Sequence, residues 1–164
     1  MGTEIERKFI VDLGAVAATA LTQGHAMVQG YLSRAPTVRV RVATPAEGPP
    51  KAWLTVKGPG TLARAEFEYE IPVDDAKAMM PLCNAVITKV RHHLRVGAHV
   101  WDVDVYDGRY RGLVVGEIEL DAVDTPFERP AWVREEVTDD PRYSNAALAL
   151  AATVSVREGR LDAG

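Results

Sequence analysis

The stretch TEIERKFIV, residues 3–11, decides the fold because charged and apolar side chains alternate along it. Successive side chains of a β-strand point to opposite faces of the sheet. Glu4, Glu6 and Lys8 therefore share one face, and Ile5 lies on the other. This period of two predicts a strand whose polar face is made of ionisable groups.

The same alternation recurs along the chain and predicts seven further strands. They are expected at residues 26–33, 37–43, 51–57, 63–71, 85–96, 98–106 and 113–122. Short helices are expected at residues 13–22, 74–82 and 145–153, the last with Ser144 as its N-cap. This element order predicts a mainly-β fold, either an eight-stranded antiparallel barrel or a strongly curved sheet, with a few covering helices.

Length and composition fit one domain. The chain has 164 residues, of which 47% are apolar and 26% are charged, an ordinary globular balance. It contains no low-complexity tract, linker or fixed-period repeat. We expect residues 1–156 to form a single domain and residues 157–164 to form a polar, frayed tail.

Charge and cysteine content narrow the class of protein. A net charge of −4 argues against a broadly basic nucleic-acid binder. The single cysteine, Cys83, excludes an intramolecular disulfide framework and fits a reducing compartment. The first residues lack a signal-peptide pattern, and residues 13–33 are too polar to span a bilayer. We therefore expect a cytoplasmic protein with no nucleic-acid or membrane partner.

The polar faces of the predicted strands are nearly all ionisable, and the charges are segregated by sign. The basic rows hold Arg39 and Arg41, Lys57, and Lys89 and Arg91; the acidic rows hold Asp102 and Asp104, Glu117 and Glu119, and Glu66, Glu68 and Glu70 after Arg64. Such charges can simply face water on one side of a half-exposed sheet. The repetition of like-charged rows favours instead a closed barrel that turns this face inward.

A charged barrel interior needs a ligand that satisfies both signs, because burying unpaired charges is prohibitive. Arginine and lysine neutralise phosphate oxygens, whereas carboxylates hold Mg²⁺ or Mn²⁺. The pattern therefore indicates a polyphosphate that carries a divalent cation.

A series of short motifs follows in a fixed order along almost the whole chain. They are EIERK at residues 4–8, QGYL at 29–32, RVR at 39–41, LTVKG at 54–58, Arg64 with Glu66 and Glu68, KVR at 89–91, GEIE at 116–119, and EVT at 136–138 with Tyr143 and Asn145. In this order they resemble the CYTH superfamily, also called the triphosphate tunnel metalloenzymes. The resemblance is closest to short bacterial members that hydrolyse inorganic triphosphate.

The resemblance implies an eight-stranded antiparallel closed barrel whose tunnel binds triphosphate compounds, with a C-terminal helix at one mouth. It implies metal binding, by Mg²⁺ or Mn²⁺, at Glu4, Glu6, Glu117 and Glu119. It implies phosphate binding by Lys8, Arg39, Arg41, Lys57, Arg64, Lys89 and Arg91. The implied activity is metal-dependent cleavage of the terminal phosphate of inorganic triphosphate, by a monomer or homodimer.

Several points stay open from the sequence. The attacking water could be oriented by Glu68, by Asp104, by a pair of Lys8 and Tyr31, or by a second metal ion. The same fold could act on an organic triphosphate, as a thiamine triphosphatase or a class IV-type adenylate cyclase. It could also be a non-catalytic polyphosphate-binding module, although such a module has little use for four glutamates. His92 and His93, which follow the KVR motif, depart from the family pattern, because relatives often carry a tyrosine after this motif.

Overall fold

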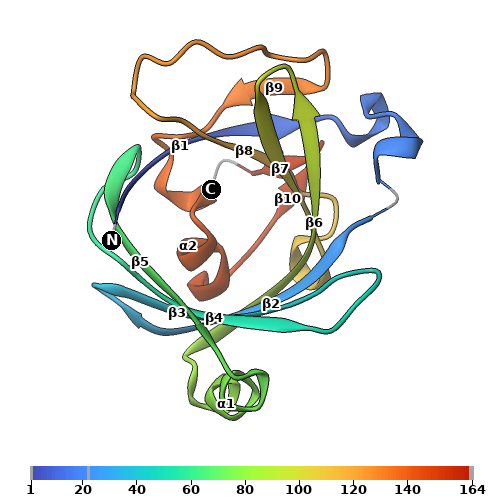
Figure 1. The fold of residues 1–164 in the computed structure, drawn as a ribbon. Coiled ribbons are helices and arrows are strands. Elements are labelled where there is room, and N and C mark those ends of the chain that lie inside the picture. The colour runs from blue at the N-terminus through green and yellow to red at the C-terminus, as the bar shows by residue number, and fades with distance from the viewer. Residues whose placement is uncertain (1, 22, 163–164) are drawn as a thin grey trace.

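Strands β1 to β8 close into an antiparallel barrel in the computed structural model, which describes residues 2–21 and 23–162 (Figure 1). They are β1 (Gly2–Val11), β2 (His25–Arg34), β3 (Thr37–Thr44), β4 (Lys51–Lys57), β5 (Ala63–Ile71), β6 (Ala85–Val96), β7 (His99–Tyr106) and β8 (Val114–Glu119). Their order around the barrel is β1-β5-β4-β3-β2-β6-β7-β8, and β1 closes the ring by pairing with both β5 and β8. The predicted mainly-β fold and closed barrel are confirmed.

The register of the strands brings charged residues together inside this barrel. Across β1 and β8, Glu6 lies opposite Glu119 and Lys8 lies opposite Glu117. Glu117 in turn lies opposite Asp102 of β7. Ile118, between Glu117 and Glu119, and Val103, next to Asp102, point the other way and join a hydrophobic cluster on the outside.

The two α-helices lie on opposite sides of the barrel wall. Helix α1 (Val73–Met79), followed by a 3₁₀ turn at Met80–Leu82, packs outside, whereas α2 (Asn145–Leu150) lies within the ring of strands (Figure 1). Ser144 caps α2 as predicted, because its Oγ accepts a hydrogen bond of 3.1 Å from the Ala147 N–H. None of the helices formed by the described residues is long and apolar enough to cross a membrane.

Helix α2 ends three residues before its predicted end at residue 153. The guanidinium group of Arg109 donates to the carbonyls of Leu148 at 3.0 Å and of Ala149 at 2.7 Å. These carbonyls are the unpaired acceptors of a helix C-terminus. A residue distant in sequence therefore satisfies them, and the chain leaves the helix in an extended conformation at Ala151.

The helix predicted at residues 13–22 is wrong. Two 3₁₀ turns, Leu13–Ala15 and Ala18–Leu21, take its place, and residue 22 lies outside the described residues. The Asp12 carboxylate accepts a hydrogen bond of 3.1 Å from the Gly14 N–H. This local contact, together with a flexible glycine, favours a tight turn over a continuous helix.

The structure has strands that alternation did not indicate. Strand β9 (Val133–Glu136) pairs with β1, although it carries three consecutive charged residues. The end of the chain was expected to fray, but β10 (Val156–Arg157) and β11 (Arg160–Leu161) form a hairpin. Val156 and Leu161 pack against the core, which gives this polar segment an anchor. Residues 163–164 of the expected tail lie outside the described residues.

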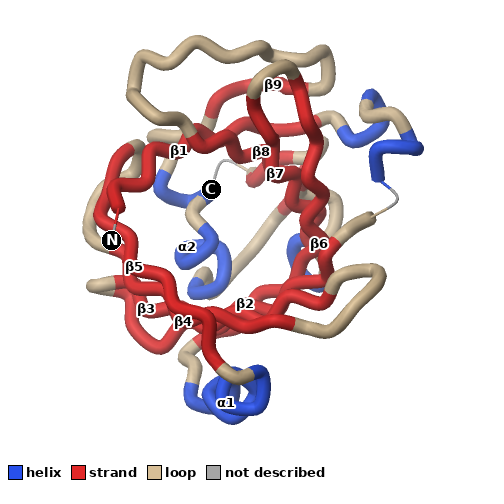
Figure 2. Tube along the Cα trace, viewed as in Figure 1, coloured by secondary structure: helices blue, strands red, loops and turns tan. Residues whose placement is uncertain are grey.

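Three hydrophobic clusters hold the barrel. One includes residues of α2, one includes residues of the long loop between β8 and β9, and one includes residues of α1. Figure 2 shows α2 inside the ring of strands, and the loop and α1 outside it. Their most buried members include Tyr106, Leu113 and Leu148 in the first, Phe9, Trp101 and Ile118 in the second, and Val40, Ala52 and Ala76 in the third. The charged part of the interior is thus supported by apolar packing on both sides of the wall.

Candidate active site

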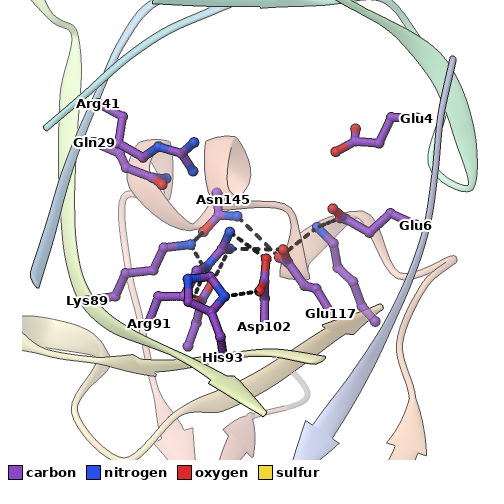
Figure 3. Close-up of polar contacts among 12 residues, drawn as sticks. Glu4, Glu6, Gln29, Arg41, Lys89, Arg91, His93, Asp102, Glu117 and Asn145 are labelled. Carbon is purple, nitrogen blue, oxygen red and sulfur yellow. Dashed lines mark hydrogen bonds and ion pairs between the residues drawn. The ribbon is translucent and has the colours of Figure 1, made fainter. Parts of the chain in front are cut away.

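A cavity of about 260 Å³ lies inside the barrel next to the start of α2. Among the described residues, six basic and seven acidic side chains line it. They are Lys8, Arg39, Arg41, Lys57, Arg64 and Arg91, and Glu4, Glu6, Glu66, Glu68, Asp102, Glu117 and Glu119. Figure 3 shows Glu4 and Glu6 on one wall and Arg41 on the wall opposite.

The glutamates of β1 and β8 are bound by basic residues of neighbouring strands. Both carboxylate oxygens of Glu4 accept from Lys57 Nζ at 2.9 Å. Lys8 Nζ lies 2.9 Å from Glu6 Oε1 and 3.4 Å from Glu117 Oε1. Glu4 also accepts from Arg64 Nε at 3.1 Å, so it lies in one network with Lys57 and Arg64. Glu6 and Glu117 share Lys8 in a second network, which Arg91 joins at 3.1 Å from Glu117. Glu119 has no ion pair within the described residues.

The acidic wall, formed by Glu4, Glu6, Glu117 and Glu119, brings carboxylates close to one another in a buried place. Burial, followed by the nearby Glu117 carboxylate, raises the pKa of Glu6 above its ordinary value. Burial and the Glu4 carboxylate likewise raise the pKa of Glu119. Burial opposes ionisation of Glu117 too, but Lys8 and Arg91 outweigh it and hold its pKa well below the usual range.

A divalent cation would relieve this crowding. Carboxylate oxygens are the donors that Mg²⁺ and Mn²⁺ prefer, so Glu4, Glu6, Glu117 and Glu119 suit such an ion. No three His, Cys, Asp or Glu side chains of residues 2–21 and 23–162 converge as a ready-made metal site. The donor chemistry and the raised pKa values of Glu6 and Glu119, which lie among other carboxylates, nevertheless fit a divalent cation.

The opposite wall, on β3, carries more positive charge than its neighbours balance. Burial, with the nearby Arg39 and Arg91 guanidinium groups, lowers the pKa of Arg41 to about 10. The Nε atoms of Arg39 and Arg41 are buried and lack a hydrogen-bond partner within the described part of the chain. Two guanidinium groups that line the cavity side by side, with only one carboxylate beside them, suit an anion.

Glu68 of β5 is the carboxylate that touches this arginine pair. Its Oε2 accepts from Arg39 Nη2 at 3.2 Å, from Arg41 Nη2 at 3.4 Å and from Thr55 Oγ at 2.9 Å. The Glu68 carboxylate is therefore engaged by donors, although the sequence offered it as a group that orients water.

Two predicted site residues, Lys89 and Asp104, do not line the cavity. Both side chains are fully buried and form an ion pair with each other. Asp104 also binds Arg91, at 2.7 Å to Nε and 2.8 Å to Nη2, and these two bases hold its pKa below the usual value although burial opposes them. Lys89 donates to Asn145 Oδ1 at 3.1 Å, so the pair lies outside the cavity lining and against the first residue of α2.

The structure does not pair Lys8 with Tyr31. Lys8 binds Glu6 and Glu117, whose charges raise its pKa despite burial, so its ammonium group stays charged. The Tyr31 hydroxyl lines the cavity and accepts from Gln29 Nε2 at 3.4 Å. Burial raises the pKa of Tyr31, which makes it a hydrogen-bond donor rather than a base at neutral pH.

Four residues of the cavity lining, Glu66, Asp102, Ser144 and Asn145, were not predicted as binding or catalytic residues, although the sequence indicated Ser144 as a helix N-cap and Asn145 as part of a motif. The first two follow from the alternation itself, because each lies two positions from a predicted site residue on the same strand. The other two belong to the start of α2, and strand periodicity carries no signal for them.

The adjacent histidines of β6 point to opposite sides of the wall. His93 Nδ1 lies 2.6 Å from Asp102 Oδ1, and its ring packs edge-on against His25 with centroids 5.2 Å apart. His92 is buried on the other face, and burial lowers its pKa. Of the two histidines, His93 is the one beside the cavity lining.

Comparisons with known proteins agree with this geometry. The CYTH domain family model matches residues 2–147, which confirms the resemblance seen in the motifs. An inorganic triphosphatase of Acetivibrio thermocellus is 42% identical over 153 residues, covering 90% of this chain and 94% of the relative. An inorganic triphosphatase of Nitrosomonas europaea is 34% identical over 155 residues, covering 90% and 97%. A crystal structure of an inorganic triphosphatase superposes with a TM-score of 0.62 at 28% identity, covering 92% of this chain and 97% of that one.

Proposed function

Since the chain belongs to the CYTH domain family, we propose that it hydrolyses inorganic triphosphate to diphosphate and orthophosphate inside its barrel, with Mg²⁺ or Mn²⁺. Two relatives that it matches over nine-tenths of its length bear the name inorganic triphosphatase. The proposal rests mainly on the cavity. Arg39 and Arg41 form a basic wall that suits an anion, and it faces the acidic wall of glutamates, which suits a cation.

The charge of the cavity supports the need for a metal ion. Its lining carries six basic and seven acidic side chains, so the walls alone bring no positive surplus. Triphosphate carries several negative charges and cannot enter such a space unless cations enter with it. A magnesium or manganese complex of triphosphate satisfies both walls at once.

The proposed metal ligands are Glu4, Glu6, Glu117 and Glu119. Mg²⁺ is commonly held by one or two carboxylates together with phosphate oxygens, so substrate and protein would share the ion. When bound, it neutralises charge on the phosphate oxygens and stabilises the leaving diphosphate.

The basic residues of the cavity would hold the phosphate chain in register. Arg39 and Arg41 offer guanidinium groups that line the cavity, and Tyr31 offers a neutral hydroxyl donor. Asp104, which lies outside the cavity lining, holds the guanidinium group of Arg91 in place by accepting two hydrogen bonds from it. Phosphoryl transfer depends mostly on such positioning and charge stabilisation, with little covalent work for the protein.

The size of the cavity favours inorganic triphosphate over organic triphosphates. A volume of about 260 Å³ is at or below the lower end of pockets that enclose drug-sized ligands, roughly 300 to 1,000 Å³. Asn145 and Ala146, at the start of α2, line this space and limit its extension into the barrel. A nucleoside or thiamine group would have to remain outside it.

The test is release of orthophosphate from inorganic triphosphate, ATP and thiamine triphosphate at equal concentration, with Mg²⁺, Mn²⁺ or a chelator. We expect metal-dependent release that is fastest on inorganic triphosphate. Faster turnover of either organic substrate, or formation of a cyclic nucleotide from ATP, would contradict the proposal. Binding of triphosphate without turnover under any condition would leave a polyphosphate-binding module instead.

We further propose that the enzyme works in the cytoplasm as a monomer or homodimer. The single cysteine, Cys83, is a free thiol, which suits a reducing compartment. Light scattering coupled to size-exclusion chromatography measures the mass directly, and a mass above two chains would contradict the assignment.

A further inference from the structure

Glu68 occupies an unusual place among the acidic residues of the barrel. Its carboxylate lies on the basic wall, where one oxygen, Oε2, accepts from both arginines of the pair 39 and 41 and from Thr55. Two guanidinium groups and a hydroxyl around one anionic oxygen form the kind of nest that a phosphate oxygen occupies. Glu68 therefore sits where a substrate oxygen would be expected.

The partners of this contact differ in their freedom to move. The side chains of Arg39 and Arg41 are 8% and 12% exposed, whereas that of Glu68 is 34% exposed. The arginines are held by the barrel, and Glu68 is at the more open edge of the cavity. Glu68 is therefore the member of the cluster that can rotate into solvent at low cost.

The contact also leaves the arginines incompletely satisfied. Glu68 binds only an Nη atom of each arginine, and both buried Nε atoms have no partner within the described residues. A single carboxylate cannot span both guanidinium groups edge-on, whereas a phosphate chain has acceptor oxygens to spare. A triphosphate has enough oxygens to replace the Glu68 contacts and to bind, in addition, Nη–H groups of the two arginines that Glu68 does not contact.

We propose that Glu68 is a built-in competitor for the arginine pair, which triphosphate must displace in order to bind. The inference rests on the proposed function and adds a determinant of affinity to it. A ligand with one or two phosphates replaces the Glu68 contact with less gain than triphosphate does. Glu68 thus weakens the binding of every phosphate ligand, and it favours the release of the products diphosphate and orthophosphate.

Calorimetric titration with the Mg²⁺ complex of a methylene-bridged, non-hydrolysable analogue of triphosphate tests this without turnover. We expect Glu68→Gln, which removes the competing charge, to lower the dissociation constant roughly three- to tenfold, the effect of one or two partly exposed ion pairs. Diphosphate affinity should rise at least as much. A Glu68→Gln variant that binds triphosphate as wild type does, or more weakly, would overturn the inference.

Glu70→Gln is the matched control. Glu70 lies two positions along the same strand, and its contact with Lys51 is at 3.8 Å with both side chains 59% exposed. It does not line the cavity, so the same change of charge there should leave the triphosphate affinity within about twofold.

Two outcomes separate this inference from the proposed function. If wild type does not bind triphosphate at all, even with Mg²⁺, the proposed function fails. If wild type binds but Glu68→Gln and Glu68→Ala bind no more tightly, only the role of Glu68 fails. Thermal unfolding of both variants establishes that the titrated protein is folded.

Discussion

The inner face of the barrel has a charged half and an apolar half, and the same strands build both. The change occurs within two residues: Lys8 gives way to Ile10 on β1, Glu117 to Val115 on β8, Asp104 to Tyr106 on β7, and Lys89 to Ile87 on β6. In the apolar half, α2 and Tyr106 fill the barrel and leave little exposed surface. In the charged half, a cavity of about 260 Å³ remains.

This difference assigns two tasks to the two ends of each strand. The apolar half and the outer clusters bury hydrocarbon surface, which is the main source of stability. The charged half holds carboxylates whose ionisation burial disfavours, as the raised pKa of Glu6 and Glu119 shows. Apolar packing next to the active site thus offsets the free-energy cost of burying its charges. Substitutions in the charged half should mainly lower activity, whereas substitutions in the apolar half should mainly lower stability.

The largest effect is expected from Glu6→Gln in the charged half. Loss of a proposed metal ligand should lower kcat/KM on triphosphate about a thousandfold, because the lost charge stabilisation acts on the transition state. The measurement is orthophosphate release at equal concentrations of folded protein. Glu70→Gln, outside the cavity, provides the control with near wild-type turnover. Wild-type turnover by Glu6→Gln would remove the residue from the metal site.

The apolar half should respond through stability. Leu148 of α2 is 1% exposed in the inner cluster, and Leu148→Ala should lower the free energy of unfolding by about 2 to 5 kcal/mol. Chemical denaturation followed by circular dichroism measures this loss. Leu82→Ala, at a leucine that is 71% exposed, should change it by less than about 0.5 kcal/mol. Equal losses in the two variants would contradict the assignment of stability to the inner cluster.

A smaller effect is expected when the anion-binding wall alone is weakened. Arg41→Ala removes a guanidinium group with an unpaired buried Nε, and it should raise KM for triphosphate about ten- to a hundredfold. Steady-state kinetics over a range of triphosphate concentrations gives the value. The exposed Arg95, changed to alanine, controls for the loss of one positive charge. An unchanged KM in Arg41→Ala would show that phosphate binds elsewhere.

The smallest effect concerns an ion pair outside the barrel. Arg7 binds Glu136 through two hydrogen bonds of 2.8 and 2.6 Å, and this contact lowers the pKa of Glu136. The contribution to stability is therefore present above the usual glutamate pKa of about 4.3 and is lost as pH falls through the lowered value.

Glu136→Gln should accordingly lower the free energy of unfolding by no more than about 1 kcal/mol at pH 7. The difference from wild type should shrink as the pH falls below about 4. Denaturation curves at pH 7 and at pH 3 measure both values. A difference that grows on acidification would contradict this account of the pair.

Alternation in the sequence predicted the strands and the face on which each charge lies, because a period of two is a local property. It did not predict how far along the barrel axis each residue lies. Lys89 and Arg91 share a face, yet Arg91 lines the cavity and Lys89 lies beneath Asn145. Register between strands and the position of α2 decide how far along the axis a residue lies, and both depend on contacts between residues distant in sequence.

The same reason explains the errors at the ends of elements. Helix α2 stops where Arg109 meets its last carbonyls, and the final hairpin forms because Val156 and Leu161 reach the core. Strand β9 pairs with β1 despite its run of charged residues. Each of these depends on a partner that no local pattern displays.

The separation of tasks between the two halves is tested most directly by measuring the rate of triphosphate hydrolysis and the free energy of unfolding on the same samples of wild type, Glu6→Gln and Leu148→Ala. We predict that Glu6→Gln loses the rate and keeps its stability, since the ionised carboxylate is disfavoured there. Leu148→Ala should lose stability and keep the rate at temperatures where it is folded. A Glu6→Gln variant as unstable as Leu148→Ala, or a folded Leu148→Ala variant as slow as Glu6→Gln, would contradict the account.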